Sequence, residues 1–188
     1  GGCGGMVDDG NGGNGCSGCP GRVYKYESGT WTRIGSDSDG DAGGVAAEPH
    51  NNIALSDDGS IVAIGAYGND GNGTNGGHVR VYQNNSGTWT QIGSDIDGEA
   101  GADAAAHYNN ISLSDDGSIL AIGAYGNDGN GTYSGPVRVH QPTSGTWTQT
   151  RSDLDGDAAY DHPGWSVSLS AAGASVAVTA SRTAGIVS

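Results

Sequence analysis

The sequence predicts an all-β fold, built from antiparallel four-stranded units that repeat along the chain, on three observations. Trp31, Trp89 and Trp147 are each 58 residues apart, and longer phrases recur at the same spacing, which indicates an array of one supersecondary unit. Each period holds four short segments rich in Val, Ile, Thr, Tyr and Trp, as strands are. Gly, which occurs 37 times in 188 residues, interrupts every window in which a helical period could develop.

The first two segments of each repeat are expected to be inner strands. In one copy they read "NISLS" from Asn110 and "SILAIGA" from Ser118. The connection "SDDGS" contains Asp-Gly, a signal for a tight hairpin. In the preceding copy the second segment reads "IVAIGA" from Ile61 and is apolar on both faces. We therefore expect this strand to be buried on both sides.

The third and fourth segments are expected to lie further out. In "VRVYQ", Val79 and Val81 alternate with Arg80 and Tyr82, which predicts one apolar face and one wet face. A Ser-Gly turn leads to the fourth segment, "TWTQIG" from Thr88. Four antiparallel strands, buried inside and wetter outside, describe the blade of a β-propeller.

The strand starts carry a family resemblance. "DHPGWSVSLS" from Asp161 and "NISLSDDGSILAIGA" from Asn110 resemble the FG-GAP repeats of integrin-α-like β-propellers, and the likeness spans nearly the whole chain after Pro20. WD-type and other "SDDGS" propellers share the hairpin. The resemblance implies a propeller with a binding or adhesion role. The family's calcium loop between the first two strands is not carried over, because "SDDGS" is a shortened version of it.

The order of the segments predicts a β-propeller-like array with about three blades' worth of strands in permuted order. A third-fourth pair, from about Arg22 to Ile34, comes first, two complete sets follow, and a first-second pair, Trp165 to Ala180, comes last. The two pairs could complete one blade. Propellers typically have ~4 to 8 blades, so the alternatives are a fragment of a larger propeller, a homodimer with six blades, or an open array. We expect Trp165 to lie in the core.

Two sequence domains are predicted: a Gly- and Cys-rich loop segment at 1–20 and the β-propeller repeat domain at 21–188. The first holds Cys3, Cys16 and Cys19. A structural zinc site usually has four ligands, often from two CxxC pairs, and the second pair is missing, so a loop disulfide or free thiols are expected. No apolar run approaches the ~18 residues of a membrane helix, which argues against membrane insertion.

The acidic net charge of the chain argues against one class of partner and suggests a metal cofactor. The formal net charge is −14, from 7 Lys+Arg and 21 Asp+Glu, so we expect no nucleic-acid partner. An acidic phrase after each fourth segment places carboxylates at alternate positions in a Gly-containing turn, which suits a hard cation such as calcium. The alternative is a solvated turn in which Asp bonds its own backbone. The candidate metal ligands are Asp37, Asp39, Asp41, Asp95, Asp97, Glu99, Asp153, Asp155 and Asp157.

The near-identical repeats favour a non-catalytic binding or adhesion module, extracellular or at the cell surface, with a protein or glycan ligand. No G-x-S-x-G or HExxH motif is present, and no catalytic residue is predicted. One alternative is a propeller-type glycan-acting hydrolase, which would need two carboxylates ~5 to 9.5 Å apart. Another is a purely structural repeat. The repeated tryptophans are expected to pack between blades rather than to stack on sugar rings.

Overall fold

All described elements of the computed structural model are β-strands, and the described residues contain no helix. The model describes residues 21–38, 53–66, 73, 76–99, 110–124, 126–127, 132, 134–157 and 164–179. Accordingly, the described chain offers no helix that is long and apolar enough for a membrane span. The predicted all-β class is therefore confirmed, whereas segment 1–20 with its three cysteines lies outside the described residues.

Two complete blades form the middle of the chain. In each, the four predicted segments pair as consecutive antiparallel strands. A short extra strand, β7 (Ile96–Asp97), pairs with the third strand of the first full blade. The first full blade consists of β3 (Ile53–Leu55), β4 (Ile61–Ala66), β5 (His78–Asn85) and β6 (Thr88–Gln91), and the second of β8 (Ile111–Leu113), β9 (Leu120–Gly123), β10 (Val137–Thr143) and β11 (Thr146–Gln149).

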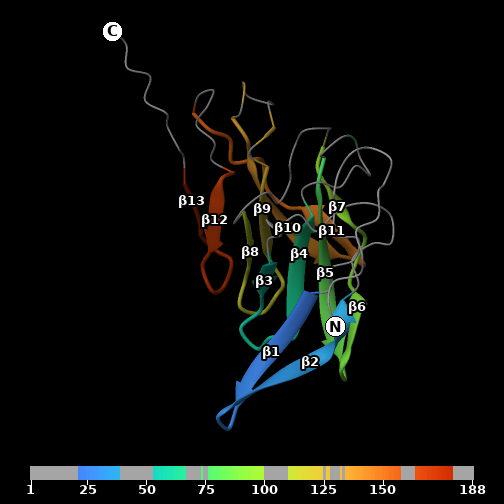
Figure 1. The fold of residues 1–188 in the computed structure, drawn as a ribbon. Coiled ribbons are helices and arrows are strands. Elements are labelled where there is room, and N and C mark those ends of the chain that lie inside the picture. Colours follow the sequence, from blue (N-terminus) through green and yellow to red (C-terminus); the bar gives the residue numbers. More distant parts are fainter. Residues whose placement is uncertain are drawn as a thin grey trace, which may run out of the picture.

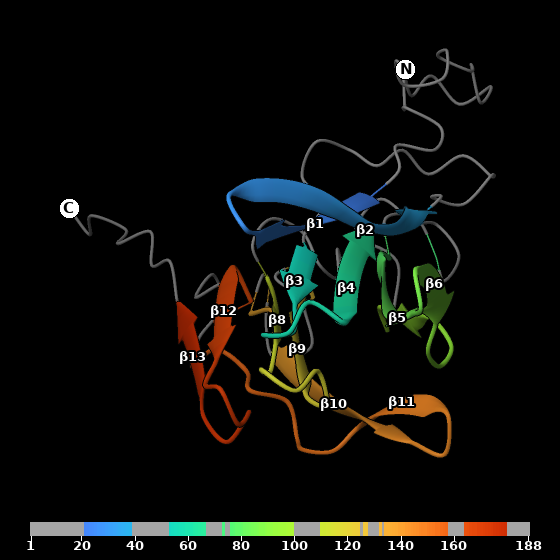
Figure 2. The same cartoon turned by 90° about the horizontal axis from the view of Figure 1, so that it is seen from below.

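A two-stranded hairpin lies at each end of this array (Figures 1 and 2). The N-terminal hairpin is β1 (Gly21–Glu27) with β2 (Thr30–Ser38), and the C-terminal hairpin is β12 (Ser166–Leu169) with β13 (Val176–Thr179). Strand β2 contacts β6, β3 contacts β8, and β8 contacts β12. The two hairpins belong to separate sheets, so they do not complete one blade with each other.

The turns between third and fourth strands follow the predicted Ser-Gly signal. The serine has a positive φ of 50° to 53° in all three copies, and the following glycine has a φ of 84° to 95°. Positive φ at both central positions defines the type I′ turn, whose twist matches that of the flanking strands. The residues are Ser28-Gly29, Ser86-Gly87 and Ser144-Gly145.

The "SDDGS" turns form the predicted tight hairpins between the first and second strands, with a positive φ at the glycine alone. In the second full blade, Asp116 Oδ1 accepts hydrogen bonds from the Ser114 hydroxyl and from the Ser118 backbone N–H and hydroxyl. The Ser118 N–H is the first cause of a pKa of about 2 for Asp116. The equivalent Asp58 accepts the same three bonds. This phrase therefore encodes a carboxylate-capped turn.

Adjacent blades are joined by the repeated tryptophan. Trp147 Nε1 donates to the carbonyl oxygen of Ile92 at 2.9 Å, and Trp89 Nε1 donates to that of Ile34 at 3.2 Å. Each bond crosses from the fourth strand of one unit to the end of the preceding fourth strand. Trp147 is only 6% exposed. The expected packing between blades is thus confirmed for these two tryptophans.

The main core lies between the two full blades. Side chains from β4 and β5 and the end of the first full blade pack against those of β8, β9 and β11. Trp165 is 42% exposed, so its expected place in the core is wrong. It lies at the C-terminal hairpin, where no described blade follows to cover it. The buried core residues are Ala63, Val79, Val81, Ile96, Ile111, Leu113, Leu120, Ile122 and Trp147.

We expect Gly93→Ala to lower the free energy of unfolding by about 2–3 kcal/mol. A Cβ at Gly93 would lie 2.8 Å from Trp147 Cδ1, and the φ of this glycine is +81°, so steric clash adds to backbone strain. Gly87→Ala is the matched control: its φ is +95° and a Cβ there meets nothing within 4 Å, so only about 1 kcal/mol of strain is expected. Equal losses in urea denaturation would contradict the Trp–Gly contact.

Candidate functional site

A repeated ion pair places the acidic phrases in the fold. Arg80 Nε and Nη2 donate to the two carboxylate oxygens of Asp95 at 2.9 and 2.6 Å. In the second full blade, Arg138 Nε donates to Asp153 Oδ2 at 3.1 Å. A two-bond arginine–carboxylate pair fixes geometry as well as charge. Two of the predicted calcium ligands therefore hold the end of each fourth strand to the third strand of the same blade.

Arg138 also connects the two full blades. Its Nη2 donates at 2.7 Å to Oε2 of Glu99, which belongs to the acidic phrase of the first full blade. The sequence predicts a wet face on the third strand, yet Arg138 and His140 on β10 are 6% and 8% exposed. That expectation is wrong here, because the end of the preceding blade covers this face of β10.

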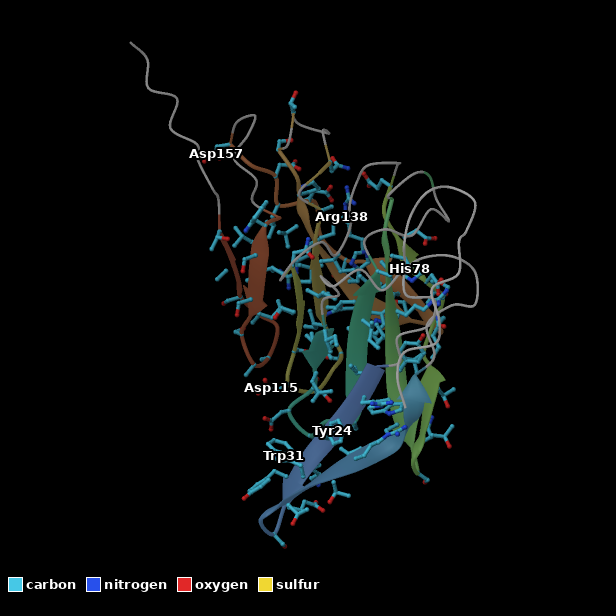
Figure 3. All side chains as sticks on the ribbon, in the orientation of Figure 1. Tyr24, Trp31, His78, Asp115, Arg138 and Asp157 are labelled. Atoms are coloured by element: carbon cyan, nitrogen blue, oxygen red, sulfur yellow. The ribbon has the colours of Figure 1, made fainter. Side chains whose placement is uncertain are left out.

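A pocket of about 110 Å³ lies at this junction. Its lining combines apolar side chains with charged and amide groups of both blades. Figure 3 shows Arg138 and His78 toward one end of the strands and Asp115, in an inner turn, toward the other. The pocket therefore lies away from the inner turns. The lining residues are Ile96, Asp97, Glu99, Ile122, Ala124, Arg138, His140 and Gln149.

His140 is, with Arg138, one of the two buried polar residues in the lining of this pocket. Burial, followed by the positive charge of Arg138, lowers the pKa of His140 to about 4, so its imidazole is neutral at pH 7. Its Nδ1 is buried and has no hydrogen-bond partner among the described residues. A buried polar atom without a partner carries a desolvation cost.

A second group of possible ligands lies at β7. One ligand atom each of His78, Asp95 and Asp97 fall within 4.8 Å of one another, and this is the one such group among the described residues. Strand pairing places His78 directly opposite Asp97. Arg80 donates to Asp95 and holds its pKa below the usual value. The group is specific to the first full blade, because the position equivalent to His78 is Pro136.

Sequence reasoning missed His78, because its distance from the acidic phrase follows no metal-binding spacing. The pairing of β5 with the two-residue β7 is the only signal, and a strand of that length leaves no sequence period. Of the other predicted ligands, Asp39 and Asp41 lie outside the described residues, and Asp37 is described only as part of β2. Asp155 and Asp157 are exposed and belong to no described metal group.

The fold and the repeated ion pairs define an all-β repeat protein with propeller-type blades. No family model matches the chain, and no curated protein matches it. Among solved structures it is similar to the periplasmic gluconolactonase PpgL of Pseudomonas aeruginosa, at 19% sequence identity and a TM-score of 0.45, over 79% of this chain and 39% of that chain. The chain thus spans less than half of that protein's length. The resemblance to FG-GAP repeats stays a prediction.

Proposed function

We propose that this protein is a non-catalytic binding or adhesion module, extracellular or at the cell surface, which holds part of a protein or glycan ligand in the pocket between the full blades. The composition of the pocket carries this proposal. Ile96, Ile122 and Ala124 supply an apolar wall, whereas Asp97, Glu99 and Gln149 supply polar groups. Ligand pockets typically combine apolar walls with a few placed hydrogen-bonding groups.

The electrostatics of the carboxylates supports binding over hydrolysis. A glycosidase needs a carboxylic acid whose pKa is raised, so that it can donate a proton. Asp95, by contrast, has a lowered pKa because Arg80 donates to it. Asp153 and Glu99 both accept from Arg138. These three carboxylates accept hydrogen bonds from arginine, which stabilises the junction and is a structural role rather than that of a proton donor.

A glycan array probed in the presence of a chelator tests this function. We expect binding without cleavage of the bound glycans, and Asp97→Ala to weaken it about tenfold, the effect of losing one hydrogen bond from a charged group. Asp155→Ala is the matched control, because Asp155 is the equivalent exposed residue of the second full blade and does not line the pocket. Cleavage of the bound glycan would instead favour a glycan-acting hydrolase.

Calcium stabilisation is the second part of the proposal, with the carboxylates of Asp95 and Asp97, beside His78, as oxygen ligands. A site with a Kd near 1 mM, as in many extracellular modules, would raise the free energy of unfolding by about 1.4 kcal/mol at 10 mM calcium. Calorimetry with and without calcium measures this change, and Asp97→Asn should abolish it while Asp155→Asn should not. No shift in the wild-type protein at millimolar calcium would remove the metal hypothesis.

A further inference from the structure

The repeat itself shows which side chains a neighbouring blade buries. Ile111 and Leu113 on β8 are 8% and 9% exposed, whereas the equivalent Ile53 and Leu55 on β3 are 60% and 44% exposed. Strand β8 contacts β3 on one side and β12 on the other. Strand β3, by contrast, contacts one neighbouring first strand among the described elements, which is β8. The exposed apolar face of β3 therefore marks the place of a preceding pair of first and second strands.

The C-terminal hairpin has the complementary open edge. Strand β9 pairs with β8 and β10 and is buried along its length, whereas its equivalent β13 pairs among the described strands with β12 alone. Val178 on β13 is 40% exposed, against 4% for the equivalent Ile122. No third described strand lies along the open edge of β13.

The N-terminal hairpin supplies such a strand and lacks the opposite one. Strand β1 has the position of β10, yet among the described strands it pairs only with β2. Tyr24 is 48% exposed, whereas His140 at the equivalent position of the second full blade is 8% exposed. Likewise, Trp31 is 66% exposed, whereas the equivalent Trp147 is 6% exposed. Within the described part of the chain, no strand in the position of a second strand pairs with the open edge of β1.

We propose that two copies of this chain associate through these edges, so that β13 of each copy pairs with β1 of the other. Each such pairing completes one four-stranded blade. With two full blades from each copy and two composite blades, the ring has six blades, within the usual range of ~4 to 8. A two-fold axis relates the two composite blades, so the assembly is closed and removes the open edges.

The repeat also fixes the expected register. In the second full blade, Val139 pairs with Ala121 and His140 with Leu120. The equivalent positions place Val23 of one copy opposite Ala177 of the other. Tyr24 then lies opposite Val176. This pairing adds the apolar strand β13 of one copy to the open edge of β1 of the other.

Hydrogen bonds also link the turns between first and second strands of successive blades, each turn donating to the next one along the chain. The Asp57 N–H donates to the Asp115 carbonyl at 2.8 Å, and the Asp115 N–H donates to the Ala171 carbonyl at 2.9 Å. In the ring, the Ala171 N–H of one copy meets the Asp57 carbonyl of the other. The side chains Ile61 and Ile119 pack on glycines of the following turns, so the interior seams give the template for this junction.

One position makes the composite seam different from the interior seam. Trp147 packs on Gly93, but the residue equivalent to this glycine in the second full blade is Arg151, which is exposed. Trp31 of the second copy therefore meets an arginine side chain instead of a glycine. A guanidinium over an indole ring is a favourable cation–π contact, which suits a junction formed between chains.

Sedimentation of the 188-residue chain over a range of concentrations tests the assembly. We expect a species of twice 18.6 kDa, and Val178→Lys should weaken its association at least about tenfold, because a charge on an edge strand opposes pairing. Thr146→Lys, an exposed change on the outer strand β11, should leave association unchanged. Circular dichroism checks that both variants stay folded. A folded wild-type monomer at micromolar concentration, or open polymers, would overturn the proposal.

Cross-linking tests the register independently. In a background with Cys3, Cys16 and Cys19 changed to serine, Val23→Cys combined with Ala177→Cys should give disulfide-linked dimers on a non-reducing gel. Lys25→Cys combined with Ala177→Cys is the control, because it shares the face of β1 but is shifted by two residues. Equal cross-linking of both pairs, or dimers with the shifted pair alone, would overturn the register derived from β9 and β10.

Discussion

Replacing Arg138 by methionine should lower the free energy of unfolding by about 3 kcal/mol, the lower end of the range for breaking a buried ion pair. The Arg138 side chain is only 8% exposed and pairs with both Glu99 and Asp153. Its loss leaves Asp153, which is 28% exposed, without its cation. The full range is not expected, because the Glu99 side chain is 61% exposed and regains water. Urea denaturation followed by circular dichroism measures the change.

A second ion pair provides the control for this prediction. Lys25 and Glu27 on β1 form a 2.8 Å pair whose side chains are 56% and 59% exposed. Exposed pairs contribute little, because water and salt screen them. Lys25→Met should therefore leave the unfolding midpoint unchanged. If Arg138→Met has no larger effect than Lys25→Met, the junction between the blades does not depend on this arginine.

Acidification from pH 7 to pH 5 should lower the free energy of unfolding by about 2 kcal/mol through His140 alone. The pKa of His140 is about 4 in the folded protein and 6.5 ordinarily. Between these values the unfolded chain binds a proton that the folded protein does not, so stability falls as pH falls from 6.5 toward 4. Urea denaturation at half-unit pH steps measures the slope.

The variant His140→Tyr distinguishes the contribution of His140 to the pH dependence of stability from that of the other titrating groups. Tyrosine is the residue at the equivalent position of the first full blade, Tyr82, and it does not titrate in this range. The variant should lose most of the slope between pH 7 and 5. Asp116, with its pKa lowered to about 2, contributes stability that is lost only as pH falls from about 4 toward 2. An unchanged slope in the variant would contradict the role of His140.

Local signals in the sequence predicted the strands and most turns, because the 58-residue period aligns each strand with its copies. The Ser-Gly pairs gave the turn that the backbone adopts, with positive φ at Ser86 and Gly87. The wet face of the third strand was wrong for Arg138, since its partner Glu99 lies 39 positions away. The alternation of residues along a strand predicts burial from that strand alone, whereas this face of β10 is buried by residues of the other full blade.

The ion pairs of the acidic phrases could have been recognised in the sequence. Arg80 precedes Asp95 by 15 positions, and Arg138 precedes Asp153 by the same distance. Opposite charges that repeat in register within a predicted blade indicate a structural pair. The group formed with His78 could not be recognised in this way, because it occurs once and depends on the pairing of β7.

The tryptophan contacts and inner-turn hydrogen bonds between blades also bear on how the chain opens. In repeat proteins, stability is a sum of terms within units and between nearest neighbours. The second full blade makes both kinds of contact with the first full blade and an inner-turn hydrogen bond with the C-terminal hairpin, whereas each end hairpin adjoins a single full blade. The hairpins should therefore open first in local unfolding, and amide protons of β9 should exchange slowest. The free energy of local opening would then decrease from the second full blade toward both end hairpins.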